Sequence, residues 1–112
     1  MEKPFPSTKL RQARQEILTH IALIEEMRRG SVTRQLLKIR RKGQREPVLT
    51  GPYALFTCKK KGRTVGRRLQ DPEEIRRLEH QVQNFHTFQE LCRRLVEIGE
   101  KICEERERKE NR

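Results

Sequence analysis

Apolar residues recur at helical spacing near the start of the chain. They fall at steps of three and four, which places them on one face of a helix over residues 7–29. This apolar face comprises Leu10, Ala13, Ile17, Ile21, Ile24 and Met27. Ser7 or Thr8 can cap the first turn, and Gly30 is a typical C-terminal stop. The pattern therefore predicts an amphipathic helix that ends at about Arg29.

A second and longer helix is predicted over residues 71–108. Asp71 is a good N-cap, Pro72 fits the first helical position and Glu74 completes a capping-box pattern. The apolar positions recur close to a heptad step: Ile75, Leu78, Val82, Phe85, Phe88, Leu91, Cys92, Leu95, Ile98 and Ile102. The helix is longer than the first, so its C-terminal part is expected to keep a bare apolar stripe at Leu95, Ile98 and Ile102. Such a stripe predicts homodimerisation through this helix.

Extended structure is predicted for residues 51–69. The residues that favour strands are Tyr53, Phe56, Thr57, Thr64 and Val65. Lys60-Lys61-Gly62 is typical of a three-residue hairpin loop, which pairs Lys59 with Arg63. An isolated two-stranded hairpin is marginal in water, so one of its faces is expected to pack on a helix.

The segment between the first helix and the hairpin, residues 30–50, is compatible with either a short helix or a strand. Its apolar residues are Val32, Leu36, Leu37 and Ile39. Gly43 and Pro47 interrupt any regular element that follows. We expect a flexible basic loop that becomes ordered on binding.

These elements predict a single domain over residues 1–112 that is mainly α with a small β-hairpin. An antiparallel pair of long helices is joined by a basic loop (30–50) and a two-stranded antiparallel hairpin (51–69). Hydrophobic residues make up only 32% of the chain and charged residues 38%, which suits elongated helices better than a large core.

Positive charge is concentrated in the middle of the chain. Residues 28–69 contain 14 Lys or Arg and one acid, Glu46, whereas the chain as a whole has a net charge of +11. Such a segment attracts phosphates and predicts nucleic-acid binding. The predicted contacts are Arg40, Arg41, Lys42, Arg45, Lys59, Lys60, Lys61, Arg63, Arg67 and Arg68. Tyr53 and Phe56 can stack on unpaired bases if exposed, but core packing is the favoured role for both.

Catalytic and metal-binding patterns are not found. Glu46 is the only carboxylate near the basic centre, and His80 and His86 are six residues apart on one predicted helix, which does not suit joint metal binding. Cys58, Cys92 and Cys103 form no CxxC pair. We therefore expect a protein without enzymatic activity, metal or other cofactor. The absence of a signal peptide or transmembrane-length span predicts a cytoplasmic protein, including association with the nucleoid, and no membrane partner.

Several short motifs are shared with a known group of proteins. The stretches are RRGSVTRQLL and TGPYALFTCKKKGRTVGRRLQDPEEIRRLEHQVQNF, which together cover roughly residues 28–100. They resemble a short, poorly characterised bacterial and archaeal family often encoded beside or within transposon-type elements. Many relatives carry a small cysteine cluster before the Gly51-Pro52-Tyr53 motif, where this chain has KIRRKGQREP. The resemblance implies an accessory role near mobile-element DNA.

Three functional hypotheses follow from these patterns. The first is a DNA-binding accessory protein that uses the basic hairpin and loop. The second keeps the same basic surface but makes structured RNA the ligand. The third is a helical interaction module that docks on an acidic partner such as a transposase.

Overall fold

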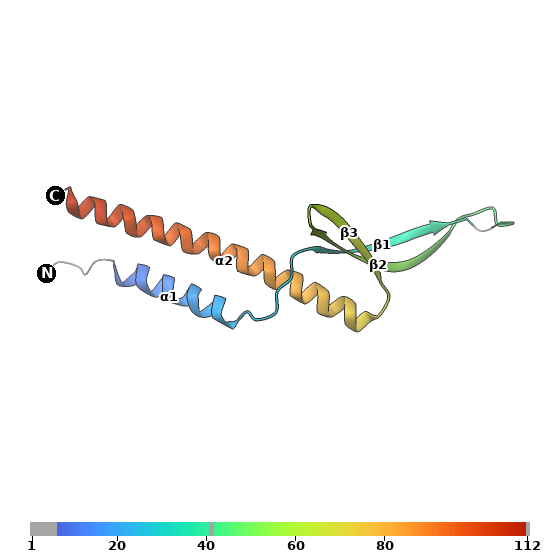
Figure 1. Cartoon of the computed structure of the whole chain (residues 1–112), viewed down its shortest axis with the longest axis horizontal. Helices are drawn as coiled ribbons and strands as arrows, with labels where there is room; N and C mark the ends of the chain where they lie inside the picture. The colour runs from blue at the N-terminus through green and yellow to red at the C-terminus, as the bar shows by residue number, and fades with distance from the viewer. Residues whose placement is uncertain (1–6, 41, 112) are drawn as a thin grey trace. The chain divides into compact units, whose positions relative to one another are not determined.

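The computed structural model describes residues 7–40 and 42–111, which form two helices and a three-stranded antiparallel sheet (Figure 1). In chain order the elements are α1 (Thr8–Leu23), β1 (Ser31–Ile39), β2 (Val48–Lys60), β3 (Arg63–Leu69) and α2 (Pro72–Glu110). The fold is mixed α/β. The prediction of a mainly α protein with a two-stranded hairpin is corrected by the additional strand β1.

The residues divide into two compact units. One unit, Glu26–Phe85, contains the sheet and the first part of α2. The other contains α1 and the part of α2 that begins at His86. Each unit is described separately below.

Helix α2 begins as the sequence predicts. Pro72 is its first residue, and the Asp71 carboxylate accepts a hydrogen bond from the backbone N–H of Glu73 at 3.2 Å. Glu73 and Glu74 in the first turn complement the positive end of the helix dipole. The helix continues without a proline to Glu110, so the predicted long C-terminal helix is confirmed.

Helix α1 also starts as predicted, because the Ser7 hydroxyl accepts a hydrogen bond from the backbone N–H of Leu10 at 3.3 Å. It ends at Leu23, however, and not at about Arg29. The backbone N–H of Arg28 donates to the Gln81 carbonyl at 3.1 Å, and the Asn84 amide donates to the Glu26 carbonyl at 2.8 Å. These bonds to α2 replace the helical bonds that residues 24–29 would otherwise make, and the sequence pattern does not contain this information.

In the unit that contains α1, this helix and α2 run in opposite directions and bury apolar residues from both (Figure 1). Ile17 and Leu91 are each only 3% exposed. The stripe expected to be bare is half-buried at Leu95, Ile98 and Ile102. Ile102 lines a hollow with three α1 residues, Arg11, Arg14 and Gln15. The expectation of a bare stripe is therefore corrected, and homodimerisation stays a prediction.

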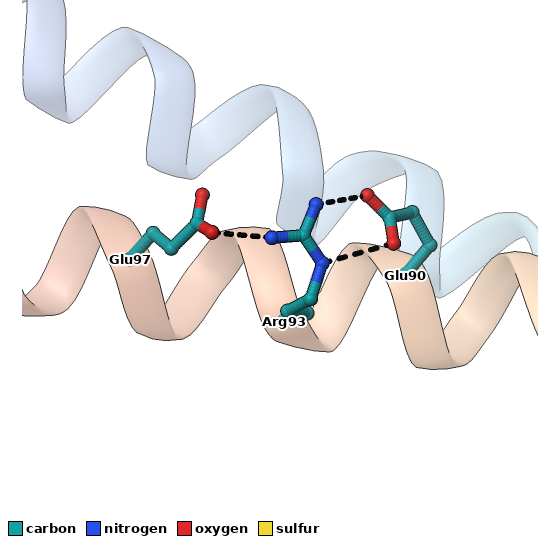
Figure 2. Close-up of polar contacts among 3 residues, drawn as sticks. All are labelled: Glu90, Arg93 and Glu97. Carbon is teal, nitrogen blue, oxygen red and sulfur yellow. Dashed lines mark hydrogen bonds and ion pairs between the residues drawn. The ribbon is translucent and has the colours of Figure 1, made fainter.

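The exposed surface of this part of α2 carries a local ion-pair network (Figure 2). Arg93 lies between Glu90 and Glu97 and pairs with both carboxylates. Its Nε donates to Glu90 Oε2 at 3.0 Å. The spacings of three and four residues are those at which helical side chains meet. The hydrogen bond from Arg93 holds the pKa of the Glu90 carboxyl below its ordinary value.

The prediction of a basic loop over residues 30–50 is wrong for its first half, because residues 31–39 form strand β1. This strand pairs with β2, with Ser31 opposite Thr57 and Gln35 opposite Tyr53. The paired residues are 26 positions apart at Ser31 and 18 apart at Gln35. Non-local pairing of this kind fixes the conformation of a segment whose own sequence is compatible with helix or strand.

Strand β2 starts at Val48, before the Gly-Pro pair predicted to open the hairpin. The register between β1 and β2 shifts between Gln35 and Leu37, opposite Gly51 and Pro52. Proline has no N–H to give to a strand ladder, so it is tolerated at such an irregularity. The Gly-Pro pair thus lies within a long strand.

The turn between β2 and β3 has two residues, Lys61 and Gly62, and not the predicted three. Lys61 has a φ of 53° and Gly62 a φ of 80°, the positive values that a type I′ turn requires. Lys60 therefore pairs with Arg63, and Lys59 pairs with Thr64. The predicted pairing of Lys59 with Arg63 is wrong by one residue, which exchanges the two faces of β3 relative to β2.

The core of the Glu26–Phe85 unit lies between one face of the sheet and α2. Its buried residues are Ala54, Phe56 and Leu69 from the sheet with Ile75, Leu78 and Val82 from the helix. Val32 and Cys58 pack against its margin. The expectation that one hairpin face packs on a helix is confirmed, and this packing fixes which side chains face away from α2.

Candidate nucleic-acid interface

The face of the sheet opposite α2 has no helix over it within the Glu26–Phe85 unit. The pleat places alternate residues of each strand on this face, and the pairing register identifies them. We call it the open face: Ser31, Thr33, Gln35, Tyr53, Leu55, Thr57, Lys59, Thr64, Gly66 and Arg68. It combines hydroxyls with basic side chains and carries no carboxylate.

Three arginines of the basic segment are bound to α2 on the other face. Arg67 pairs with Glu74 at 2.6 Å, and Arg34 pairs with Glu79 at 2.7 Å. Arg28 donates from Nε to Gln81 Oε1 at 3.0 Å, and its guanidinium lies 6.0 Å from the Phe56 ring centroid. Arg67 was predicted to contact nucleic acid, but its charge is balanced here by a carboxylate.

The two candidate stacking residues are placed differently. Phe56 is 7% exposed and belongs to the core, so it is not placed to stack on a base. Tyr53 is half-buried on the open face. The guanidinium of Arg68 lies 4.8 Å from the centroid of the Tyr53 ring, which is cation–π geometry. Arg67 and Arg68 therefore point to opposite faces, as neighbouring residues of a strand must.

Four exposed cations surround the turn between β2 and β3. We call Lys59, Lys60, Lys61 and Arg63 the tip cluster. Within the described residues, none of the four pairs with a carboxylate. Lys59 belongs to the open face, and Lys60 and Arg63 project from the other side of the ribbon. The cluster can therefore present charge on both sides of the turn.

The second group of predicted contacts lies in the connection between β1 and β2. We call Arg40, Lys42 and Arg45 the loop cluster; all three are exposed. The Arg40 side chain donates from Nη2 to the Arg45 carbonyl at 3.4 Å, which closes the loop on itself. Arg41, predicted with this group, lies outside the described residues.

The two clusters lie at opposite ends of β2. The loop cluster precedes this strand and the tip cluster follows or ends it. With 13 residues in β2 and a rise of ~3.3 Å per residue, the clusters are about 40 Å apart along the strand. They are therefore two separate clusters at the ends of the open face and do not form one compact patch.

An open hollow of about 430 Å³ lies beside the tip cluster. It is lined by Arg29, Gly30, Ser31, Thr57, Cys58, Lys59 and Thr64. The Ser31 and Thr57 hydroxyls are 2.9 Å apart and hydrogen bonded to each other. Two cations and three hydroxyls thus line one concavity without a carboxylate.

Sequence patterns did not identify the hollow residues Arg29, Ser31, Thr57 and Thr64. The signal that could have found them is the spacing in multiples of two that places Ser31 and Thr33, and likewise Thr64 and Arg68, on one face of a strand. This spacing is informative only if residues 31–39 are recognised as a strand and the β2–β3 turn is given two residues. The first condition depends on the pairing of β1 with β2, and the second on the register of the β2–β3 turn.

Within residues 7–40 and 42–111, no cluster of three His, Cys, Asp or Glu side chains could hold a metal ion. Neither helix, over the residues described, is long and apolar enough to cross a membrane. No protein-family model matches the chain, and no curated protein or solved structure matches it either.

Proposed function

We propose that this protein binds nucleic acid through the open face of its sheet, with the tip and loop clusters as its two terminal contacts and duplex DNA as the ligand. The observation that carries the proposal is the distribution of charge over the sheet. Arginines on the helix side are bound to α2, whereas the cations at both ends of β2 have no carboxylate partner within the described residues. Cations without partners are available to displace counterions from phosphates.

The side chains of the open face favour contact with a phosphate backbone over stacking on unpaired bases. Its one aromatic residue, Tyr53, already has the Arg68 guanidinium against its ring. Hydroxyls and cations are groups that contact phosphates and position a duplex. Single-strand binding proteins depend instead on accessible aromatic rings. A duplex ligand is therefore the better match.

The test is charge reversal at the tip cluster. The triple variant Lys60→Glu, Lys61→Glu and Arg63→Glu should abolish binding of a fluorescent DNA duplex in an anisotropy titration. The matched control reverses Lys9, Arg94 and Lys101, three exposed residues of α1 and α2. The control has the same net charge, so it should keep most of the wild-type affinity. Equal affinities of wild type and tip variant, at unchanged helicity, would refute the proposal.

We also propose, from the short motifs that resemble a transposon-associated family, that the DNA bound is mobile-element DNA. In that setting the protein would act as an accessory factor, either on the DNA or on a transposase bound to it. Competition between duplex DNA, hairpin RNA and single strands separates DNA from RNA as the ligand. Docking on a protein partner would be favoured by two results together. The purified protein would carry no nucleic acid before a salt wash, and it would then bind an acidic protein but none of the three competitors.

A further inference from the structure

We infer that the hollow beside the tip cluster is a phosphate subsite that holds one phosphodiester group of the bound nucleic acid. This inference rests on the proposed function and assigns a specific contact to it. The subsite comprises the side chains of Arg29, Ser31, Thr57, Lys59 and Thr64, arranged around the backbone of Gly30. None of these residues except Lys59 belongs to the contacts predicted from the sequence.

The hydroxyl pair in the hollow retains a hydrogen-bond donor for an anion. Ser31 Oγ and Thr57 Oγ1 share one hydrogen bond at 2.9 Å, and either atom can be its donor. Each hydroxyl has one O–H, so whichever residue accepts in this pair still has its own proton to donate. Thr64 supplies a further hydroxyl from β3. The non-bridging oxygens of a phosphodiester are charged acceptors that suit these donors.

The charge of the hollow is positive and confined to one side of the sheet. Lys59 contributes an ammonium group from the end of β2, and Arg29 contributes a guanidinium from the segment before β1. Both residues are exposed, and no described carboxylate pairs with either. A phosphate in the hollow would therefore contact two cations without having to displace an existing ion pair.

Gly30 sets the shape of this site. Its φ is +140°, and a Cβ at this position would lie 2.6 Å from the Thr57 carbonyl oxygen and 2.8 Å from the Phe56 ring. Only glycine allows the chain to approach β2 this closely. The approach brings Arg29 and Ser31 against Thr57 and Lys59, so the hollow is formed by the fold and not by side-chain rotation alone.

Hydroxyl deletion tests the subsite without changing charge. The double variant Ser31→Ala with Thr57→Val removes the shared donor, because Ser31→Ala alone would leave the Thr57 O–H free to donate. This double variant and the single variant Thr64→Val should each weaken binding of a 16-base-pair DNA duplex by about tenfold, since each removes a donor to a charged acceptor. Their log–log salt slopes should stay at the wild-type value because no cation is lost. Lys59→Gln should weaken binding and reduce the slope by about 0.9, the value for one phosphate contact on duplex DNA.

Thr19→Val is the matched control. Thr19 is an exposed residue of α1, outside the sheet, and its hydroxyl accepts a hydrogen bond from the Gln15 side chain at 3.4 Å. It should bind like wild type. If the double variant Ser31→Ala with Thr57→Val and the variant Thr64→Val also bind like wild type while the tip-cluster reversal abolishes binding, the subsite is refuted and the proposed function survives. If wild type does not bind any duplex, the proposed function itself fails.

A last arm identifies the source of the phosphate. The titrations are repeated with duplexes that end in 5′-hydroxyl or 5′-phosphate groups, and with inorganic phosphate as competitor. An equal loss for Thr64→Val on both duplexes supports an internal phosphodiester. That assignment would be overturned if Thr64→Val lost affinity only for the duplex with 5′-phosphate ends. It would also be overturned if millimolar inorganic phosphate abolished the difference in affinity between this variant and wild type.

Discussion

The separation of the two basic clusters predicts how binding depends on the length of the ligand. If both clusters contact one duplex, a duplex shorter than their separation can reach only one of them at a time. Shortening the DNA should therefore remove about half of the electrostatic contacts. The perturbation changes the ligand and leaves the protein intact.

The magnitude follows from the length of β2. Its 13 residues span about 40 Å, which corresponds to about 12 base pairs at ~3.4 Å per pair. Four cations in the tip cluster and three in the described loop cluster give, at ~0.9 per phosphate, a log–log salt slope of about −6 for a 16-base-pair duplex. An 8-base-pair duplex should give about −3.

The assay is fluorescence anisotropy at several salt concentrations with both duplexes. Two triple variants are matched controls, one with glutamine at Lys60, Lys61 and Arg63 and one with glutamine at Arg40, Lys42 and Arg45. The first variant retains the loop cluster together with Lys59, and the second retains the tip cluster. Each keeps about four of the cations, so its slope should already be between about −3 and −4 on the long duplex and should change little on the short one. A wild-type slope that is independent of length would refute two-ended binding. An equal loss of slope in wild type and both variants would instead attribute the effect to the DNA ends.

Three further predictions concern stability and ionisation. Phe56→Ala should lower the free energy of unfolding by about 3–5 kcal/mol in urea denaturation, because the ring is buried between the sheet and α2. As a control, Val65→Ala, at a position 44% exposed, should lower the free energy of unfolding by less than about 1 kcal/mol. Lys61→Asn should raise the thermal unfolding midpoint, because asparagine tolerates the left-handed conformation of this turn residue better than lysine does. Arg93→Gln should raise the pKa of Glu90 toward its ordinary value in a carboxyl NMR titration. The stabilisation from this pair is present above the ordinary pKa of Glu90 and is lost as the pH falls through the lowered value.

Local signals predicted the helix starts because capping is a short-range property. Ser7 and Asp71 accept the hydrogen bonds expected of N-caps, and Pro72 occupies the first position of α2. The end of α1 was not predictable in this way. The bonds that hold residues 24–29 against α2 join groups such as Arg28 and Gln81, which are far apart in the sequence.

The sheet was only partly predictable for the same reason. β2 and β3 are joined by a two-residue turn, so their pairing is local, and the sequence indicated the hairpin but missed its register by one residue. A shift of one residue is decisive, because it moves Leu69 into the core opposite Ala54. β1 pairs across a long connection, and its basic residues concealed the alternation that identifies a strand.

The basic segment contains more cations than it leaves available to a ligand. Residues 28–69 have a net charge of +13 by sequence, yet Arg34 and Arg67 are paired with carboxylates of α2, and Arg28 is bound to Gln81 and Phe56. These arginines connect the sheet to the helix that covers it. Substituting one of these arginines should therefore weaken the packing between the sheet and α2 more than it weakens contact with a phosphate.

The cations of this segment thus form two sets that the fold separates by strand face. Arg34 on β1 and Arg67 on β3 turn toward α2 and pair with its carboxylates, whereas Arg68 and Lys59 belong to the open face. If all the cations of this segment faced α2, their excess positive charge would repel the helix. If all of them faced away, the carboxylates of α2 would lack these ion-pair partners. Because the pleat alternates, the segment can supply ion pairs to α2 and still present, at both ends of β2, cations that pair with no carboxylate of the described residues. It is this second set that the proposed contact with a phosphate backbone would use.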